Sequence, residues 1–165
     1  MDEDTRPDPP HAAPARDMVE AFLDFQRATL LWKISGLSDD DLRRSFVPSG
    51  ITLLGMVEHL AYVERWWFRS IFANEDVSFP WTEADPDADW RIEPTETTAE
   101  VLALYNDEVA RARVIVANAA WDDVARKPGR DHTLGWILTH MVEEVARHVG
   151  HADLFRELID GQTGE

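Results

Sequence analysis

The stretch HMVEEVARHVGHADLF, residues 140–155, decides the fold class, because its apolar residues recur at the spacing of an α-helix. Met141 and Val145 mark the apolar stripe of that helix. His148 falls inside the stripe and Glu144 lies at its shoulder, where a carboxylate is costly unless it is paired or bound to a metal. The stretch therefore predicts a helix whose buried side carries a polar site.

Other segments of the chain have the same helical period. The predicted long helices cover residues 17–35, 52–73, 98–119 and about 133–159. Ser38 is the expected N-cap of a short helical turn, and Thr52 is the expected N-cap of the second long helix. In the first helix the apolar residues at mixed three- and four-residue steps are Met18, Phe22, Phe25, Leu30 and Trp32.

No segment alternates convincingly between apolar and polar residues, as a half-buried strand would. The sequence therefore predicts an all-α protein, and the economical arrangement is a four-helix bundle. The second and third long helices are joined by a long loop, residues 74–94, which contains three prolines and two tryptophans. A loop of that length is usually disordered or functional, and its aromatic residues favour a folded flap.

The length of 165 residues indicates one compact domain. Residues 1–15 carry four prolines and little that packs, so we expect a flexible N-terminal tail there. Residues 16–165 are expected to form the single domain.

Charge and composition exclude several classes of function. The 32 acidic residues outnumber the 16 Lys and Arg residues, and the net charge of -16 argues against nucleic-acid binding. The chain has no cysteine, which excludes disulfides, zinc fingers and a cysteine nucleophile. No apolar run reaches the roughly 20 residues that span a membrane, and the N-terminus does not resemble a signal peptide. We expect a cytoplasmic protein with no membrane contact.

A candidate metal site emerges from two helices. His59 lies at the edge of the apolar stripe of the second long helix, while Glu144 and His148 lie one turn apart on the last. Bundles build metal sites from such sets, and three protein ligands leave positions open for water or substrate. The alternatives are that His59 is a hydrogen-bonded boundary residue and that Glu144 pairs with His148, His140 or Arg147.

Three further polar residues need an explanation. Glu64 lies within the apolar stripe of the second helix, where it either pairs with a buried arginine or supports a metal ligand from behind. His151 lies one turn beyond His148, outside the stripe. His132 is expected to border the start of the last helix.

Two long motifs, FVPSGITLLGMVEHLAYVERWWF at residues 46–68 and DHTLGWILTHMVEEVARHVGHADLFRELIDG at residues 131–161, resemble the actinobacterial mycothiol-transferase branch of the DinB-like superfamily. The resemblance extends from about Ala21 to Gly161 and implies a four-helix bundle.

The resemblance also implies a divalent metal, held by a histidine of the second helix and by a pair four residues apart on the last. These are His59, Glu144 and His148 in this chain. Many relatives have histidine in place of Glu144, whereas the maleylpyruvate isomerase relatives are similar to this chain in having glutamate. His151 stands where many relatives have glutamine, and it is therefore a candidate fourth ligand or a residue that supports one.

By this resemblance the chain is a metal-dependent thiol S-transferase that joins mycothiol, or a similar small thiol, to an electrophilic small molecule. Zinc is the first choice of metal, with nickel, manganese or iron also compatible with the ligands. The loop around Phe79, Trp81 and Trp90 is expected to cover the electrophile. The rival hypotheses are a metal-dependent hydrolase and a non-catalytic bundle that binds a metal or small ligand. A homodimer is the expected assembly.

Overall fold

A computed structural model of the chain describes residue 4 and residues 6–163. Its helices are α1 (Ala15–Ile34), α2 (Asp39–Leu42), α3 (Leu53–Glu64), η1 (Arg65–Phe72), η2 (Ala88–Trp90), α4 (Thr98–Ala117) and α5 (Leu134–Asp160). Within the described residues there is no β-strand, only two isolated bridges. The predicted all-α, four-helix bundle is confirmed, with α3 and η1 together forming its second long helix.

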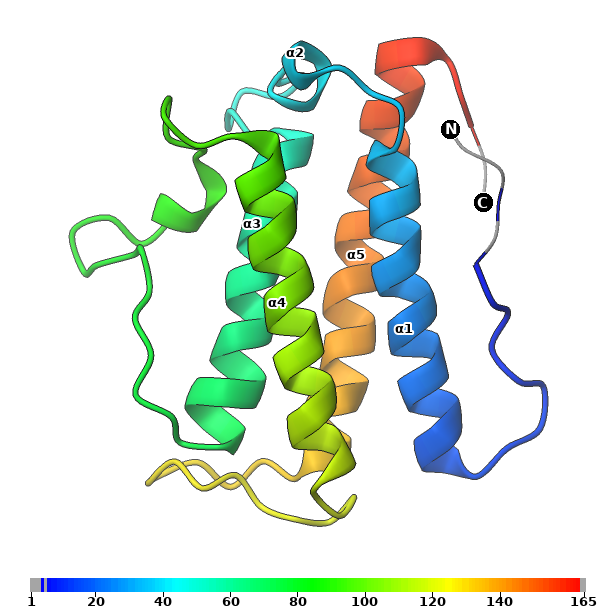
Figure 1. Cartoon of the computed structure of the whole chain (residues 1–165), viewed down its shortest axis with the longest axis vertical. Helices are drawn as coiled ribbons and strands as arrows, with labels where there is room; N and C mark the ends of the chain where they lie inside the picture. The colour runs from blue at the N-terminus through cyan, green and yellow to red at the C-terminus, as the bar shows by residue number, and fades with distance from the viewer. Residues whose placement is uncertain (1–3, 5, 164–165) are drawn as a thin grey trace.

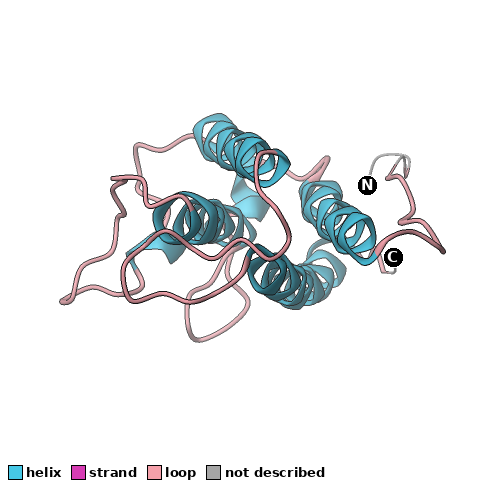
Figure 2. Cartoon of the chain, turned by 90° about the horizontal axis from the view of Figure 1, so that it is seen from below, coloured by secondary structure: helices cyan, strands magenta, loops and turns pink. Residues whose placement is uncertain are grey.

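The four long helices surround one core. In Figure 1, α1 lies beside α5 and α3 lies beside α4, and Figure 2 shows the same helices seen from below. Apolar side chains from all four fill the interior, and most are leucine, isoleucine, valine, phenylalanine or methionine. Burying each such side chain stabilises the fold by about 1.5–3 kcal/mol. The long loop predicted between the second and third helices lies on the outer side of α3, away from α1 (Figure 1).

Side-chain caps fix where the helices begin. The hydroxyl of Thr52 accepts a hydrogen bond from the Gly55 amide, and that of Ser38 accepts one from Asp41, as predicted. The third long helix starts at Thr98, and its N-cap is Thr97. At the other end of the chain, α5 ends at Gly161, whose φ of 75° is readily adopted only by glycine.

The inward face of α1 is not the face that carries its aromatic residues, since Phe22 is 43% exposed while its neighbour Leu23 is 1% exposed. The buried face runs through Leu23, Arg27 and Leu30 at four- and three-residue steps. Because an arginine occupies the middle position, apolar residues alone do not reveal this stripe. Arg27 is buried because it binds Glu64 of α3.

The second long helix changes its winding at Arg65, where the sequence predicts a continuous α-helix. Residues 65–72 form a π-helix, a rare conformation that is frequent at functional sites. Contacts with α4 hold it, since Arg65 and Arg69 both donate to the buried carboxylate of Glu108 at 2.9 Å.

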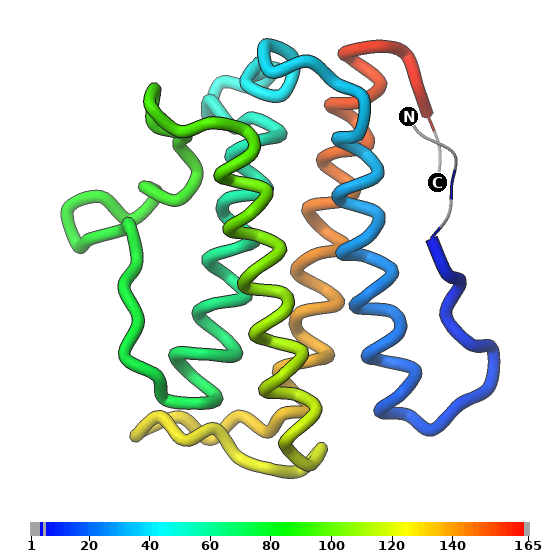
Figure 3. The backbone as a smooth tube through the Cα atoms, in the orientation of Figure 1, coloured from blue at the N-terminus to red at the C-terminus, as the bar shows by residue number. Residues whose placement is uncertain are grey.

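The N-terminal segment runs along the outside of α1 (Figure 3). The guanidinium of Arg6 lies 4.1 Å from the ring centroid of Trp32 and 4.8 Å from that of Phe25, and it donates to the Thr29 hydroxyl. Residues 1–3 and 5 of the predicted tail lie outside the described residues. The flexibility of residues 1–15 and the single domain at 16–165 stay predictions.

No helix in residues 6–163 is both long and apolar enough to cross a membrane.

Candidate metal centre

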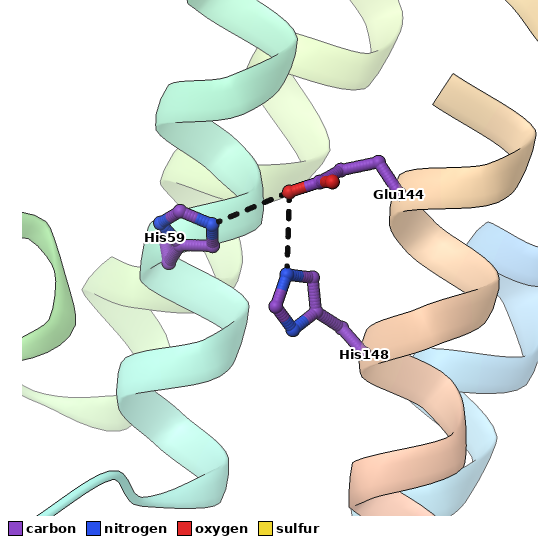
Figure 4. A group of neighbouring side chains, drawn as sticks. All are labelled: His59, Glu144 and His148. Carbon is purple, nitrogen blue, oxygen red and sulfur yellow. Dashed lines mark hydrogen bonds and ion pairs between the residues drawn. The ribbon is translucent and has the colours of Figure 1, made fainter. Parts of the chain in front are cut away.

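Three side chains converge in the groove between α3 and α5. His59 comes from α3, and Glu144 and His148 come from consecutive turns of α5 (Figure 4). One ligand atom from each lies within 4.8 Å of the other two. The Nε2 atom of His148 is 3.3 Å from Oε1 of Glu144, and Nε2 of His59 is 3.7 Å from the same oxygen. The four-residue spacing on α5 and the capped start of α3 bring these atoms together.

The centre lies between the core and an open pocket. His148 is 7% exposed, whereas His59 and Glu144 are half-buried. A pocket of about 440 Å³ opens beside them and is called the tryptophan pocket below. Its lining includes His59, Glu144, Trp66, Trp67, Trp81 and Trp90. A small molecule in this pocket would therefore reach the convergent ligand atoms.

Asp89 fixes the orientation of the His59 ring. Its buried carboxylate lies 2.7 Å from Nδ1 of His59. Since a carboxylate accepts hydrogen bonds, Nδ1 carries the ring proton and donates a hydrogen bond to Asp89. When the ring is neutral, the other ring nitrogen, Nε2, therefore has a lone pair on the side of Glu144 and His148, where a cation can bind it. A carboxylate behind a metal-binding histidine is a regular part of such sites. The ring is also held by Trp90, which stacks on it with centroids 3.8 Å apart.

Gly55 allows η2 to approach α3 closely enough for these contacts. A Cβ atom built at Gly55 would lie 2.3 Å from the carbonyl oxygen of Trp90, which real side chains do not tolerate. The glycine therefore brings Asp89 and Trp90 against the His59 ring, one turn further along the helix.

Hydrogen bonds set the charges of the centre. The hydrogen bond from His148 and the ion pair with His59 hold the pKa of Glu144 well below its ordinary value, so the carboxylate stays ionised. Burial opposes a charge on His59, but its hydrogen bond to Asp89 and its ion pair with Glu144 outweigh burial and raise its pKa. Without a metal, the His59 ring therefore holds a second proton more readily than a free imidazole does, and a cation that binds Nε2 must displace that proton.

The donor set fits a divalent cation. Two imidazoles and one carboxylate are ligands that zinc, nickel, manganese and iron all accept. Zinc–ligand bonds of about 2.0–2.1 Å in tetrahedral geometry require ligand atoms roughly 3.3–3.4 Å apart. The two separations from Glu144 Oε1, 3.3 and 3.7 Å, come close to that requirement, and all three ligand atoms lie within 4.8 Å of one another. In addition, Nδ1 of His148 is buried and has no hydrogen-bond partner within the described residues.

The other predicted site residues lie away from this cluster. Both carboxylate oxygens of Glu64 accept hydrogen bonds from Arg27, at 2.8 and 2.7 Å, which is the buried ion pair predicted as one alternative. His151 is exposed, although its ring centroid lies 5.7 Å from that of His148. His132 borders α5 as expected, beside the rings of Trp67 and Trp136.

Of the predicted loop aromatics, Trp81 and Trp90 line the tryptophan pocket. Phe79 stacks behind Trp81, with centroids 4.4 Å apart. Sequence reasoning missed Asp89, because DPDADW offers three aspartates and spacing singles out none of them. It also gave Trp66 and Trp67 no place in a pocket. The only signal in the sequence was the pair of adjacent tryptophans in RWWF, and tryptophans in a helix more often belong to the core than to a pocket.

A solved structure resembles most of the chain in fold. The crystal structure described as that of the conserved protein of a locus from Enterococcus faecalis matches with a TM-score of 0.68 and 12% sequence identity. The match covers 92% of this chain and 100% of that one. At this identity the likeness shows the fold alone. None of the curated proteins matches the chain in sequence.

A protein-family model settles the family that the two motifs indicated. The model described as Mycothiol-S-transferase matches residues 18–161, which include the whole of α3 and α5 and every residue of the candidate metal centre. The resemblance predicted from the sequence is therefore confirmed, and so is the class of enzyme. The chain belongs to the Mycothiol-S-transferase family.

Proposed function

We propose that the chain is a metal-dependent S-transferase that joins mycothiol to an electrophilic small molecule at His59, Glu144 and His148. The observation that carries the proposal is the convergence of these three ligand atoms within 4.8 Å at the wall of the tryptophan pocket. Zinc is the preferred ion, with nickel, manganese or iron as the alternatives.

The residues of the chain have distinct roles in this proposal. Asp89 holds the proton of His59 at Nδ1 and so keeps Nε2 free to bind a cation. The ionised carboxylate of Glu144 adds negative charge, which strengthens the binding of a cation. A divalent cation held there would lower the pKa of a nearby thiol and so favour the nucleophilic thiolate. Since the chain has no cysteine, no protein thiol competes for the cation or the electrophile.

The test combines metal analysis with turnover. The protein, purified without chelators, is expected to contain about one divalent ion per chain, and His59→Ala and Glu144→Ala are expected to lose it. Mycothiol conjugation of a model electrophile should fall to the uncatalysed rate in both variants. Circular dichroism should show that both variants remain helical.

Other outcomes would favour the rival functions. Turnover without added thiol would favour a hydrolase that activates water. A protein that takes up no zinc, nickel, manganese or iron would mean that the three residues form a buried polar network. A cytoplasmic location and a homodimer also belong to this proposal, and light scattering of the purified chain tests the dimer.

A further inference from the structure

A second pocket lies between α5 and the start of α3 and is called the apolar pocket below. Its volume is about 210 Å³, and its wall is formed mostly by the apolar side chains of Val47, Ile51, Met56, Leu154 and Phe155. An apolar cavity of about 150 Å³ already admits a benzene molecule. The apolar pocket is therefore large enough for a short alkyl chain or one aromatic ring.

The apolar pocket is open to solvent. Leu154 and Val47 are among the large apolar side chains that the described residues leave exposed. Among the described residues that line the pocket, His151 is the only one that can carry a charge. A neutral apolar group can therefore enter without any opening of the core, and covering these side chains would stabilise it there.

The apolar pocket is next to the candidate metal centre. The helices α3 and α5 run in opposite directions (Figure 1). Met56 lies one turn before His59 on α3. His151 lies one turn after His148 on α5, and the centroids of these two rings are 5.7 Å apart. A molecule that reacts at the centre can therefore extend an apolar group past His151 into the pocket.

The tryptophan pocket lies on the other side of the centre along the same groove. Its residues Trp66 and Trp67 follow His59 in the second long helix, and its residue Glu144 precedes His148 on α5. A reaction that joins two molecules requires both to be held at the reacting atoms. The tryptophan pocket, with about 440 Å³ and polar groups in its wall, suits the large, hydroxyl-rich mycothiol. The apolar pocket is then left for the electrophile.

We propose that the apolar pocket binds an apolar group of the electrophile, either a short alkyl chain or a single aromatic ring, and so determines which electrophiles the chain accepts. The inference rests on the proposed function for the reaction, whereas binding of the apolar group does not. Burial of apolar surface drives this binding, and each buried methylene group raises the affinity about fourfold. A cation at the centre does not oppose it, because the bound group is uncharged.

The n-alkyl acrylates provide a reaction in which atoms balance. The mycothiol sulfur forms a bond to the β-carbon, the π electron pair of the C=C bond moves to the α-carbon, and that carbon takes up the proton that the thiol has lost. Each enzymatic rate is divided by the uncatalysed rate with the same thiol, which removes differences in intrinsic reactivity. We expect kcat/KM to be at least about tenfold higher for butyl acrylate than for methyl acrylate, since three methylene groups are added.

Binding is measured separately with methyl propionate and butyl propionate, saturated esters that do not add thiols. The full chain carries isotopically labelled methionine methyl groups, and NMR follows Met56 in the apolar pocket. Met141, which is buried in the core, is the internal reference. We expect both esters to shift the Met56 resonance, with a Kd at least about tenfold lower for butyl propionate, and to leave that of Met141 in place.

Two substitutions on α5 test whether the apolar pocket causes this preference. Leu154→Gln makes part of its wall polar and should shrink the preference about fourfold, the equivalent of one buried methylene group. Leu158→Gln is the matched control, because both leucines are 60% exposed but Leu158 does not line the pocket. It should leave the preference unchanged in binding and in kcat/KM.

Equal Kd values for the two esters would overturn the inference, as would a preference that Leu154→Gln leaves intact. Light scattering that shows a dimer dissociated by Leu154→Gln, but not by Leu158→Gln, would also overturn it, because a second copy would then cover the pocket. Selective ester binding without thiol-dependent turnover would support the inference and contradict the proposed function. Thiol-dependent turnover at equal rates with both acrylates would support the proposed function and overturn the inference.

Discussion

Glu58 is a buried carboxylate next to His59 in the chain, and its Oε2 atom has no hydrogen-bond partner within the described residues. Burial, together with the nearby carboxylates of Glu96, Asp89 and Glu93, raises the pKa of Glu58 from 4.5 to about 7. The folded state therefore holds a proton that the unfolded chain has released, and stability falls as the pH rises from about 4.5 to 7.

The variant Glu58→Gln should abolish this loss, because the amide has no charge to bury. In metal-free protein we expect the free energy of unfolding to rise by about 1–3 kcal/mol at pH 8 and to change little at pH 4.5. Urea unfolding at the two pH values measures both effects. A gain of equal size at both pH values would contradict the assigned pKa.

Asp89 acts through His59, so Asp89→Asn tests the orientation of the ring. The amide no longer favours the proton at Nδ1, and we expect the affinity for zinc to fall by about 10–100-fold. Competition with a chromophoric chelator measures this affinity. Glu83→Gln is the matched control, and a loss of similar size there would mean that only the charge of the loop matters.

At the scale of the element, Gly55 sets the distance between η2 and α3. A methyl group in Gly55→Ala would meet the Trp90 carbonyl, so we expect a loss of about 1–3 kcal/mol in stability and weaker metal binding as Asp89 moves from His59. Denaturant unfolding and zinc titration check the two effects.

Gly150 provides the matched control for that substitution. It also lies inside a long helix, but a Cβ atom there would meet nothing within 4 Å. Gly150→Ala should therefore stabilise the protein by up to about 1 kcal/mol. If Gly55→Ala behaved in the same way, the close approach of η2 would not be what positions Asp89.

The buried ion pair of Glu64 and Arg27 joins α3 to α1. The variant Glu64→Gln leaves the buried charge of Arg27 without its ionic partner, so we expect the free energy of unfolding to fall by about 3 kcal/mol. The number of metal ions per chain should stay the same. Asp107→Asn breaks an exposed pair on α4 and should cost less than about 1 kcal/mol. Loss of the metal in Glu64→Gln would instead favour a role in supporting the ligands.

At the scale of the whole molecule, the centre joins helices that are far apart in the sequence, α3 and α5. An ion that binds only the folded state stabilises it by about 2.7 kcal/mol at a free concentration 100 times its Kd. We therefore expect zinc to raise the Tm of the chain and to leave that of His148→Ala unchanged. An equal rise in both, measured by calorimetry, would indicate binding elsewhere.

Much of the fold was predictable because amphipathic helices are local patterns. The period of 3.6 residues located four long helices, the hydroxyl of Thr52 marked the start of one of them, and that of Ser38 marked the start of the short helix α2. The inward face of α1 was not predictable in the same way, because Arg27 occupies a core position that only its partner on α3 explains. Long-range partners of this kind leave no mark on spacing.

The candidate centre was likewise predictable where it depends on one helix and not where it depends on the path of a loop. Glu144 and His148 lie on one helix, four residues apart, so their proximity follows from helix geometry. Asp89 reaches His59 through a loop, 30 residues along the chain, whose path depends on tertiary packing. The tryptophan pocket likewise depends on where that loop folds.

The π-helix η1 has a consequence for how the pocket opens. Its eight residues carry Trp66 and Trp67, and its conformation is maintained by contacts with α4 rather than by the preferred winding of the backbone. We therefore expect the amide protons of residues 65–72 to exchange with deuterium faster than those of α3, although both segments contain fully buried side chains. Substrate would then enter through local loosening of one wall, while the rest of the bundle stays closed to exchange.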